Sequence, residues 1–226
     1  RDAAHYVRDC FDHYGTREVP GLGAPIRRFK LFDAPFDGGS SRVLGQEPLQ
    51  NEVYRLLSSF CEKGRVDKLL MIHGPNGTAK STFVECLIGA LRKYSLLPGG
   101  ALYRFNWVFS DNAHRTGLGF GDTPTGLDED GSLAHLSADE VTFKVGDELK
   151  DHPLLLVPKA DRKELLDTLF KAAGVAPRYP VFLARGDLCA KNKAIYQALL
   201  NAHKGDWERI IQHVQVERIE ISQRYR

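Results

Sequence analysis

The residues with the clearest chemical potential form one continuous run, Gly74-Pro75-Asn76-Gly77-Thr78-Ala79-Lys80-Ser81. This run fits the phosphate-binding pattern G-x-x-x-x-G-K-[ST], except that Ala79 replaces the second defining glycine. In that pattern, several backbone N–H groups converge on phosphate oxygens at a helix N-terminus, where the helix dipole favours negative charge. The run therefore predicts a loop that binds the phosphates of a nucleotide.

Three side chains at the end of the run have expected roles toward ATP and Mg²⁺. Lys80 is expected to reach the β and γ phosphates, and the Ser81 hydroxyl to complete the coordination of Mg²⁺, which prefers oxygen ligands. Thr82 is better placed for the α phosphate. At Ala79 the backbone must still pass close to the phosphates, and Gly77 supplies part of the freedom that this needs.

The sequence around the loop predicts the elements that position it. Lys68 to His73 (KLLMIH) is a short apolar run typical of a buried strand, and Phe83 to Tyr94 shows helical spacing. An ordinary glycine-containing turn is the alternative to a phosphate loop. The order of strand, glycine loop and helix favours the phosphate loop.

The rest of the chain alternates between helical and strand patterns. Period-2 alternation over 101–109 predicts a strand with aromatic residues on one face, and 110–131 predicts a long glycine-containing loop. Helices are expected over 3–14 and 49–64, and a further helix is expected to begin at Asp161. Two more helices are expected over 187–203 and 206–213, followed by a last strand over 214–222. Phe29, Phe32 and Phe36 lie in a Pro/Gly-rich stretch that predicts an arm packed on a larger body.

Composition places the chain among ordinary globular domains. It has 226 residues, 42% hydrophobic and 27% charged, with 31 Lys plus Arg against 29 Asp plus Glu. Because both signs are interleaved, nucleic acid is not the expected partner. No apolar stretch approaches the roughly 18 residues of a membrane span, so we expect no membrane association and a cytoplasmic location. The four cysteines are far apart and are expected to be buried apolar residues, not metal ligands or disulfides.

Several segments together resemble the ATPase domain of the bacterial PrkA-type serine protein kinases, a branch of the AAA+ superfamily. They are CFDHYGTREV, RFKLFDAPF, GPNGTAKST, DELKDHPLLLVP, and the final stretch that begins GDLCAKNKAIYQALLNAHKGDWERI and ends VERIEISQRYR. The resemblance implies an α/β fold, a P-loop NTPase of AAA+ type with a parallel-sheet core and flanking helices. It divides the chain into an N-terminal helix and arm, 1–42, and a partial nucleotide-binding domain, 43–226.

The resemblance also assigns residues outside the phosphate loop. Val43, Leu44 and Gly45 resemble the AAA+ box that contacts adenine, although a simple helix-entry turn is the alternative. Arg218 and Arg224, with Arg226, hold positions suited to sensing a γ phosphate, because guanidinium offers a planar, multi-donor charge. A solvated basic strand end is the alternative there. Ile219, Glu220 and Gln223 depart from the family pattern.

Hydrolysis also needs an acidic residue to hold Mg²⁺ and orient water. Asp111 is a weak candidate, and a loop-starting Asp is the alternative account. In the resembling family this residue follows the SRRYR-like element, at which this chain ends. We therefore expect an excised domain, incomplete at its C-terminus, that binds nucleotide and has an ATPase rate near background.

Three functions are consistent with these residues. The first is the ATP-binding module of a PrkA-type kinase, in which ATP binding and hydrolysis drive a conformational or assembly change. The second is a non-catalytic nucleotide-sensing module that regulates an attached domain, and the third is a small-molecule P-loop kinase. The chain has no HRD, DFG or VAIK motif, so protein phosphorylation would belong to a separate C-terminal kinase-like domain. The resemblance also implies a homo-oligomer and leaves the protein substrate unknown.

Overall fold

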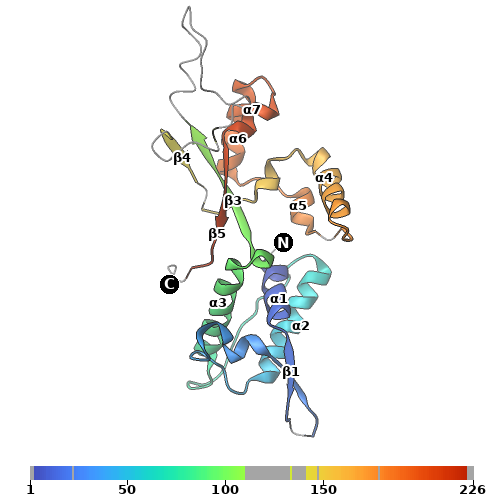
Figure 1. The fold of residues 1–226 in the computed structure, drawn as a ribbon, viewed down its shortest axis with the longest axis vertical. Helices are drawn as coiled ribbons and strands as arrows, with labels where there is room; N and C mark the ends of the chain where they lie inside the picture. Colours follow the sequence, from blue (N-terminus) through green and yellow to red (C-terminus); the bar gives the residue numbers. More distant parts are fainter. Residues whose placement is uncertain are drawn as a thin grey trace, which may run out of the picture. The chain divides into compact units, whose positions relative to one another are not determined.

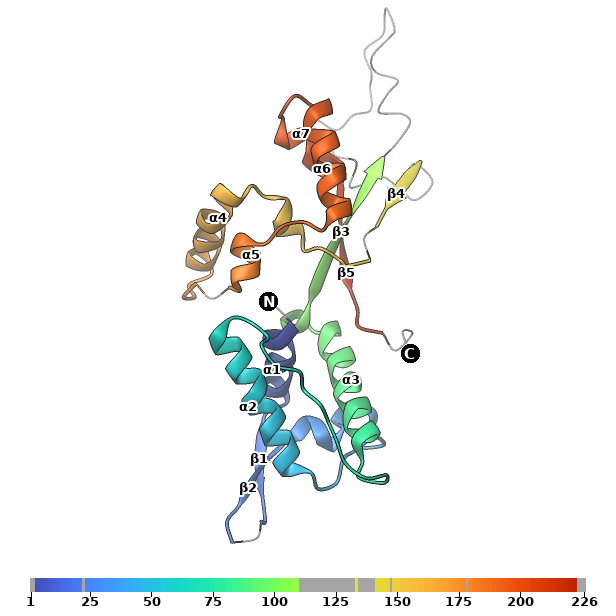
Figure 2. The same ribbon diagram turned by 180° about the vertical axis from the view of Figure 1, so that it is seen from behind.

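The computed structural model describes residues 3–21, 23–109, 133, 141–146, 148–177 and 179–222. The chain divides into two compact units. Unit 1 comprises Arg1–Leu102 and Ile219–Arg226, and unit 2 comprises Tyr103–Arg218. Figures 1 and 2 show the two units from opposite sides, and each unit is described here by itself.

Unit 1 is built around three helices, α1 (Ala3–Tyr14), α2 (Glu47–Lys63) and α3 (Lys80–Leu96). In both views α1 lies beside α2 and α3 (Figures 1 and 2). The first two helices end at glycines in the left-handed backbone region, Gly15 at φ 71° and Gly64 at φ 66°. Glycine adopts this conformation at no steric cost, which is why both helix ends were predictable from sequence.

A hairpin and two short 3-10 helices pack against these helices. Strands β1 (Thr16–Val19) and β2 (Ile26–Phe29) are antiparallel, with Thr16 opposite Phe29. The 3-10 helices η1 (Lys30–Asp33) and η2 (Pro35–Asp37) follow β2, and η3 (Pro98–Gly100) follows α3.

The predicted aromatic arm forms part of the core of unit 1. Phe29 and Phe32 are fully buried, and the Phe32 ring stacks on Phe83 of α3 with centroids 4.4 Å apart. Cys10 and Cys86 are buried in the same core, and burial raises the pKa of each thiol to about 12. Both cysteines are therefore the buried residues that the sequence predicts, whereas Cys61 and Cys189 are partly exposed.

Unit 2 contains a three-stranded sheet in the order β4-β3-β5. The bounds are Leu102–Phe109 for β3, Phe143–Val145 for β4 and Val214–Ile219 for β5. β4 is antiparallel to β3, with Val108 opposite Lys144. Along β3 and β5, Val108 N donates to His213 O while Arg104 meets Glu217, so this pair is antiparallel as well.

The core of unit 2 consists of Phe105, Trp107, Leu156, Ile210 and Val214, and partly buried residues of α6 pack against it. The helical segments of the unit follow in chain order. They are η6 (Pro153–Leu156), α4 (Lys159–Ala172), α5 (Val181–Arg185), α6 (Ala190–Ala202) and α7 (Trp207–Gln212). The Asp206 carboxylate caps α7 by accepting from Arg209 N at 3.3 Å. The helices and the two strands expected after residue 100 are thus present, with bounds shifted by a few residues at most ends.

The predicted parallel-sheet core of AAA+ type is wrong. Over the described residues the structure has seven α-helices and two small antiparallel sheets, of two and three strands. The apolar run Lys68–His73, predicted as a buried strand, forms no strand, and Leu69 and Met71 are 85% and 75% exposed. A strand needs a partner for its backbone hydrogen bonds, and an apolar run cannot specify that partner.

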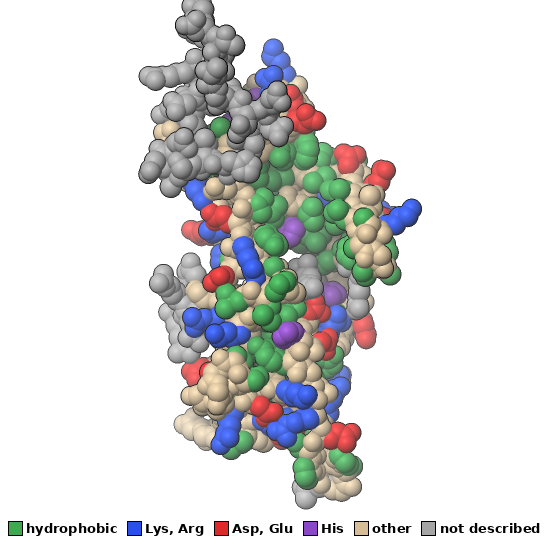
Figure 3. Space-filling model, in the orientation of Figure 1, with side chains coloured by type: hydrophobic (Ala, Val, Ile, Leu, Met, Phe, Trp, Pro, Cys, Tyr) green, Lys and Arg blue, Asp and Glu red, His purple; other side chains and the backbone are tan. Residues whose placement is uncertain are grey.

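The surface that is described carries both charge signs. On the face drawn in Figure 3, basic and acidic side chains lie among one another over the coloured surface. None of the helices described here combines the length and the apolar character that crossing a membrane requires.

Candidate functional site

The candidate site lies in unit 1 at the start of α3, which begins at Lys80, three residues before the helix that the sequence predicts over Phe83 to Tyr94. The preceding loop turns sharply through Gly77, at φ 80°, and Ala79, at φ 55°. Left-handed backbone is unfavourable for a residue that carries a Cβ, by about 1–2 kcal/mol. Ala79 therefore holds, at some cost, the conformation for which the pattern normally uses glycine.

The Lys80 side chain folds back over this loop. Its Nζ donates to the carbonyl oxygens of Gly74, at 2.8 Å, and Pro75, at 2.5 Å, and lies 3.2 Å from Thr78 Oγ1. The Thr78 hydroxyl in turn donates to Pro75 O at 2.8 Å. The ammonium group is thus held by neutral acceptors that a phosphate oxygen could replace with a stronger, charge-assisted bond.

A cavity of about 530 Å³ opens beside Lys80. Its lining has two parts, one from the phosphate loop and one from the start of α2 with the segment before the loop. The lining residues are Gln46, Pro48, Leu49, Met71, Ile72, His73, Gly74, Pro75, Thr78 and Lys80. The volume lies within the range of about 300–1,000 Å³ that is usual for small-molecule sites.

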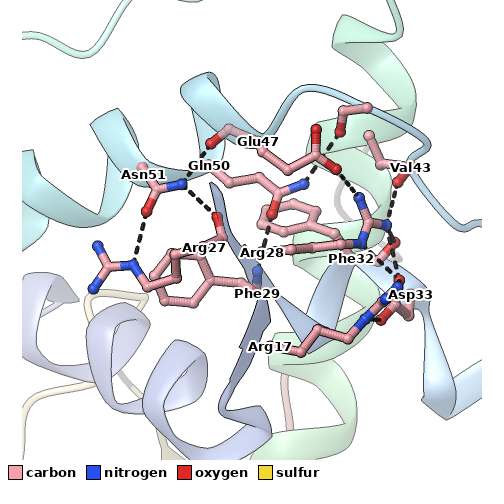
Figure 4. A network of polar contacts seen from close by, with 11 residues as sticks. Arg17, Arg27, Arg28, Phe29, Phe32, Asp33, Val43, Glu47, Gln50 and Asn51 are labelled. Carbon is pink, nitrogen blue, oxygen red and sulfur yellow. Dashed lines mark hydrogen bonds and ion pairs between the residues drawn. The ribbon is translucent and has the colours of Figure 1, made fainter. Parts of the chain in front are cut away.

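A network of polar groups around two buried side chains, Arg28 and Gln50, holds the chain that enters α2 (Figure 4). Arg28, 3% exposed, donates from Nη1 to Glu47 at 2.6 Å and from Nη2 to the carbonyl of Val43 at 2.6 Å. Its Nε donates to Asp33 at 2.8 Å. Although burial acts to raise it, hydrogen bonds from Arg17 and Arg28 hold the pKa of the Asp33 carboxyl below its ordinary value.

Gln50 on α2 completes this network. The side chain is fully buried, accepts from Phe29 N at 3.1 Å and donates to Gly45 O at 3.3 Å. Asn51, one residue on, donates to Arg27 O at 2.6 Å. The hairpin, the 43–45 segment and α2 are therefore tied together, which fixes the position of Gln46, Pro48 and Leu49 at the cavity.

The structure places the remaining predicted site residues as follows. Val43 is buried in the core of unit 1, while Leu44, 71% exposed, and Gly45 line a different cavity of about 590 Å³ beside Arg17 and Arg42. Asn76 lies at the turn of the loop, and Ser81 and Thr82 are in the first turn of α3. The loop residues Gly74, Pro75, Thr78 and Lys80 meet in one cavity, and residues 43–45 do not line it.

Of the arginines predicted to sense a phosphate, Arg218 belongs to the described part of the chain. Arg218 is on β5 in unit 2, whereas Lys80 is in unit 1. Arg224, Arg226, Asp111 and the long loop over 110–131 lie outside the described residues.

Comparisons of the chain with protein-family models, with curated proteins and with solved structures found no significant match. The resemblance to the PrkA-type ATPase domain therefore stays a prediction.

Sequence reasoning missed two parts of this site. It did not identify Pro48, Leu49 and Ile72 as cavity lining, because an apolar residue at helical spacing reads equally well as core. It also missed the Arg28 and Gln50 network. The sequence offers no signal for it, because Arg28 and Gln50 each have polar neighbours, such as Arg27 and Asn51, from which nothing local distinguishes them.

Proposed function

We propose that this chain binds a nucleoside triphosphate, ATP with Mg²⁺, in the cavity beside Lys80. The observation that carries the proposal is the composition of that cavity's wall. One side is the loop with Lys80 at a helix N-terminus. The other side is mainly apolar, with Leu49, Pro48 and Ile72 beside Gln46. A polyphosphate suits the first side, and a flat apolar base suits the second.

The phosphate end of the proposed complex follows from local chemistry. Lys80 would exchange its contacts to the Gly74 and Pro75 carbonyls for contacts to the β and γ phosphates. The first backbone N–H groups of a helix such as α3 lack helical acceptors and are available to phosphate oxygens. Ser81, in the first turn of α3, is the candidate ligand for Mg²⁺ bridging those phosphates.

The test is a titration of the full chain with a fluorescent ATP analogue, with and without Mg²⁺. We expect saturable binding that Lys80→Ala weakens by at least about tenfold, because a charge-assisted contact is lost. Lys93→Ala is the matched control, since Lys93 is an exposed lysine in the last turn of the same helix. Equal binding by the wild type and Lys80→Ala would refute the proposal.

A non-catalytic nucleotide-sensing module is the second candidate, and the cavity wall favours it over turnover. Among the described residues, no carboxylate lines the cavity. An acidic residue that orients the attacking water would have to come from elsewhere. A sensor predicts nucleotide binding with an ATPase rate near background, whereas a rate that falls sharply in Lys80→Ala would favour an ATPase.

A place in a PrkA-type serine protein kinase remains part of the proposal through the sequence resemblance alone. In that case nucleotide binding here would act on an attached C-terminal kinase-like domain or on assembly with further copies. A longer protein whose kinase activity is unchanged by Lys80→Ala would exclude this role.

A further inference from the structure

Two histidines end two consecutive helices in unit 2. His203 is the C-cap of α6 and His213 is the C-cap of α7. Their Nε2 atoms face each other at 3.3 Å, and the two rings are tilted by 30° with centroids 5.5 Å apart. Neither the phosphate loop nor the proposed nucleotide site uses this pair.

The position of the ring proton on His213 follows from its other contact. His213 Nδ1 lies 3.2 Å from the carbonyl oxygen of Val108, which can only accept a hydrogen bond. Nδ1 therefore carries the proton, and the Nε2 of neutral His213 presents a lone pair toward His203. A histidine that donates its second ring N–H to a backbone carbonyl has the arrangement usual for a metal ligand.

The separation of the two nitrogens matches a shared metal ion. Two ligands about 2.0–2.1 Å from a tetrahedrally coordinated ion lie about 3.3–3.4 Å apart, and the two Nε2 atoms are 3.3 Å apart. His213 is also fixed in place, because its backbone carbonyl accepts from Val108 N at 2.8 Å and its ring packs on Phe109. The two Nε2 atoms are within hydrogen-bond distance of each other, so metal binding would require neutral His203 to carry its proton on Nδ1 and both Nε2 lone pairs to turn toward the ion.

The surroundings favour a cation with open coordination positions. Both side chains lie at helix C-termini, the negative ends of the helix dipoles. Both are partly exposed, so water can reach an ion held there. The nearby Asp206 carboxylate is occupied with the backbone and side chain of Arg209. In the part of the chain that is described, no cluster of three ligating side chains occurs.

We propose that His203 and His213 form a two-histidine site for a divalent transition-metal ion, with water filling the remaining positions. Imidazole nitrogen suits Zn²⁺, Cu²⁺ and Ni²⁺ and does not suit Mg²⁺, which prefers oxygen. The site is thus chemically distinct from the magnesium position proposed at Ser81. A bound ion would link the ends of α6 and α7 to β3 through His213 and Val108.

The test is a titration of the untagged, metal-stripped chain with Zn²⁺ and with Co²⁺, in the absence of nucleotide. We expect one binding event that His203→Ala and His213→Ala each weaken by at least about tenfold, because even the loss of a supporting contact costs that much. His203→Cys retains a metal ligand and should retain binding. His5→Ala, which removes a partly exposed histidine of unit 1, is the matched control.

A second measurement keeps the result independent of folding. In the wild type, the ¹⁵N resonances of both Nε2 atoms should shift on addition of Zn²⁺, while the Nδ1 of His213 remains protonated. Unchanged resonances, or equal affinity in the wild type and His203→Ala, would overturn the proposal.

Discussion

Each unit buries one arginine almost completely, and the two arginines have different kinds of partner. Arg28 in unit 1 is 3% exposed, and Arg162 in unit 2 is 2% exposed. Arg28 is shared between the carboxylates of Asp33 and Glu47 and two backbone carbonyls. Among the described residues, Arg162 donates only to carbonyls, those of Leu155, Val157, Leu183 and Gly186.

This difference has a physical consequence for each unit. Desolvation by burial lowers the pKa of Arg162, and the negative charge of Asp187 acts in the opposite direction and raises it. Its planar guanidinium nevertheless ties η6 to α5 and to Gly186 through hydrogen bonds to carbonyl oxygens, and a carbonyl partner has no ionisation to lose in acid. Arg28 fixes the segment that enters α2 through ion pairs with carboxylates, so the strength of this interaction depends on their ionisation. We therefore expect acid to reduce the contribution of Arg28 to the stability of unit 1 and to leave the contribution of Arg162 to the stability of unit 2 unchanged.

The largest expected effect is that of Arg162→Met. The substitution leaves several buried carbonyls without a donor, at about 1–3 kcal/mol each, so we expect unit 2 to lose about 4 kcal/mol in its free energy of unfolding. Both tryptophans, Trp107 and Trp207, belong to unit 2, so fluorescence during urea unfolding reports on this unit. Lys163→Met, at an exposed neighbour on α4, should leave the midpoint unchanged.

Arg28→Met is expected to destabilise unit 1 by a smaller amount, about 2–3 kcal/mol. Asp33 and Glu47 have side chains 34% and 16% exposed, so water can partly replace the lost guanidinium. The variant should also weaken binding of the ATP analogue, because Glu47 lies between the cavity residues Gln46 and Pro48. Hydrogen exchange at the Val43 and Gln50 amides measures the local loss. Arg55→Met, on the exposed side of α2, is the control.

Lowering the pH should reduce the loss in free energy of unfolding that Arg28→Met causes, and it should leave the loss caused by Arg162→Met unchanged. The pKa of Asp33 is below its ordinary value of 3.8, so its pairing stabilises the fold above that pH and is lost as the pH falls further. The cost of each substitution is compared by urea unfolding at pH 6 and at pH 3. Equal costs of Arg28→Met at both pH values would contradict the assigned role of Asp33.

The smallest expected effect is that of Arg17→Ala. Arg17 also contacts Asp33, at 3.1 Å, but its side chain is 50% exposed. An exposed ion pair contributes little because water and salt screen it. We expect an unfolding midpoint equal to that of the wild type within error at 0.5 M salt. A loss as large as that of Arg28→Met would show that exposure does not separate the two arginines.

Sequence reasoning identified the elements that depend on local signals. The ends of α1 and α2 follow from Gly15 and Gly64, and most of α3 follows from the helical spacing over Phe83 to Tyr94. The sheet could not be predicted in this way. The run Lys68–His73 has the composition of a strand, yet pairing depends on residues far away in the chain.

The candidate site also has one part that local sequence predicts and another part that depends on long-range contacts. The loop from Gly74 to Lys80 is a local motif, and the structure brings four of its residues to one cavity. The opposite wall depends on how Arg28 and Gln50 fasten α2 to the hairpin, through contacts that join residues about 20 positions apart. The His203–His213 pair also escapes sequence reasoning, because an interval of ten residues is not a familiar ligand spacing.

The left-handed backbone at Ala79 has a consequence for how the loop would capture a ligand. A glycine there would relieve strain in the folded loop, but it would also let the loop visit many more backbone conformations. The methyl group narrows that set, so less conformational entropy remains to be lost when the loop closes on a ligand. We infer that Ala79 makes the loop more rigid before binding, and that this chain exchanges some stability for a shorter conformational search at the moment of encounter.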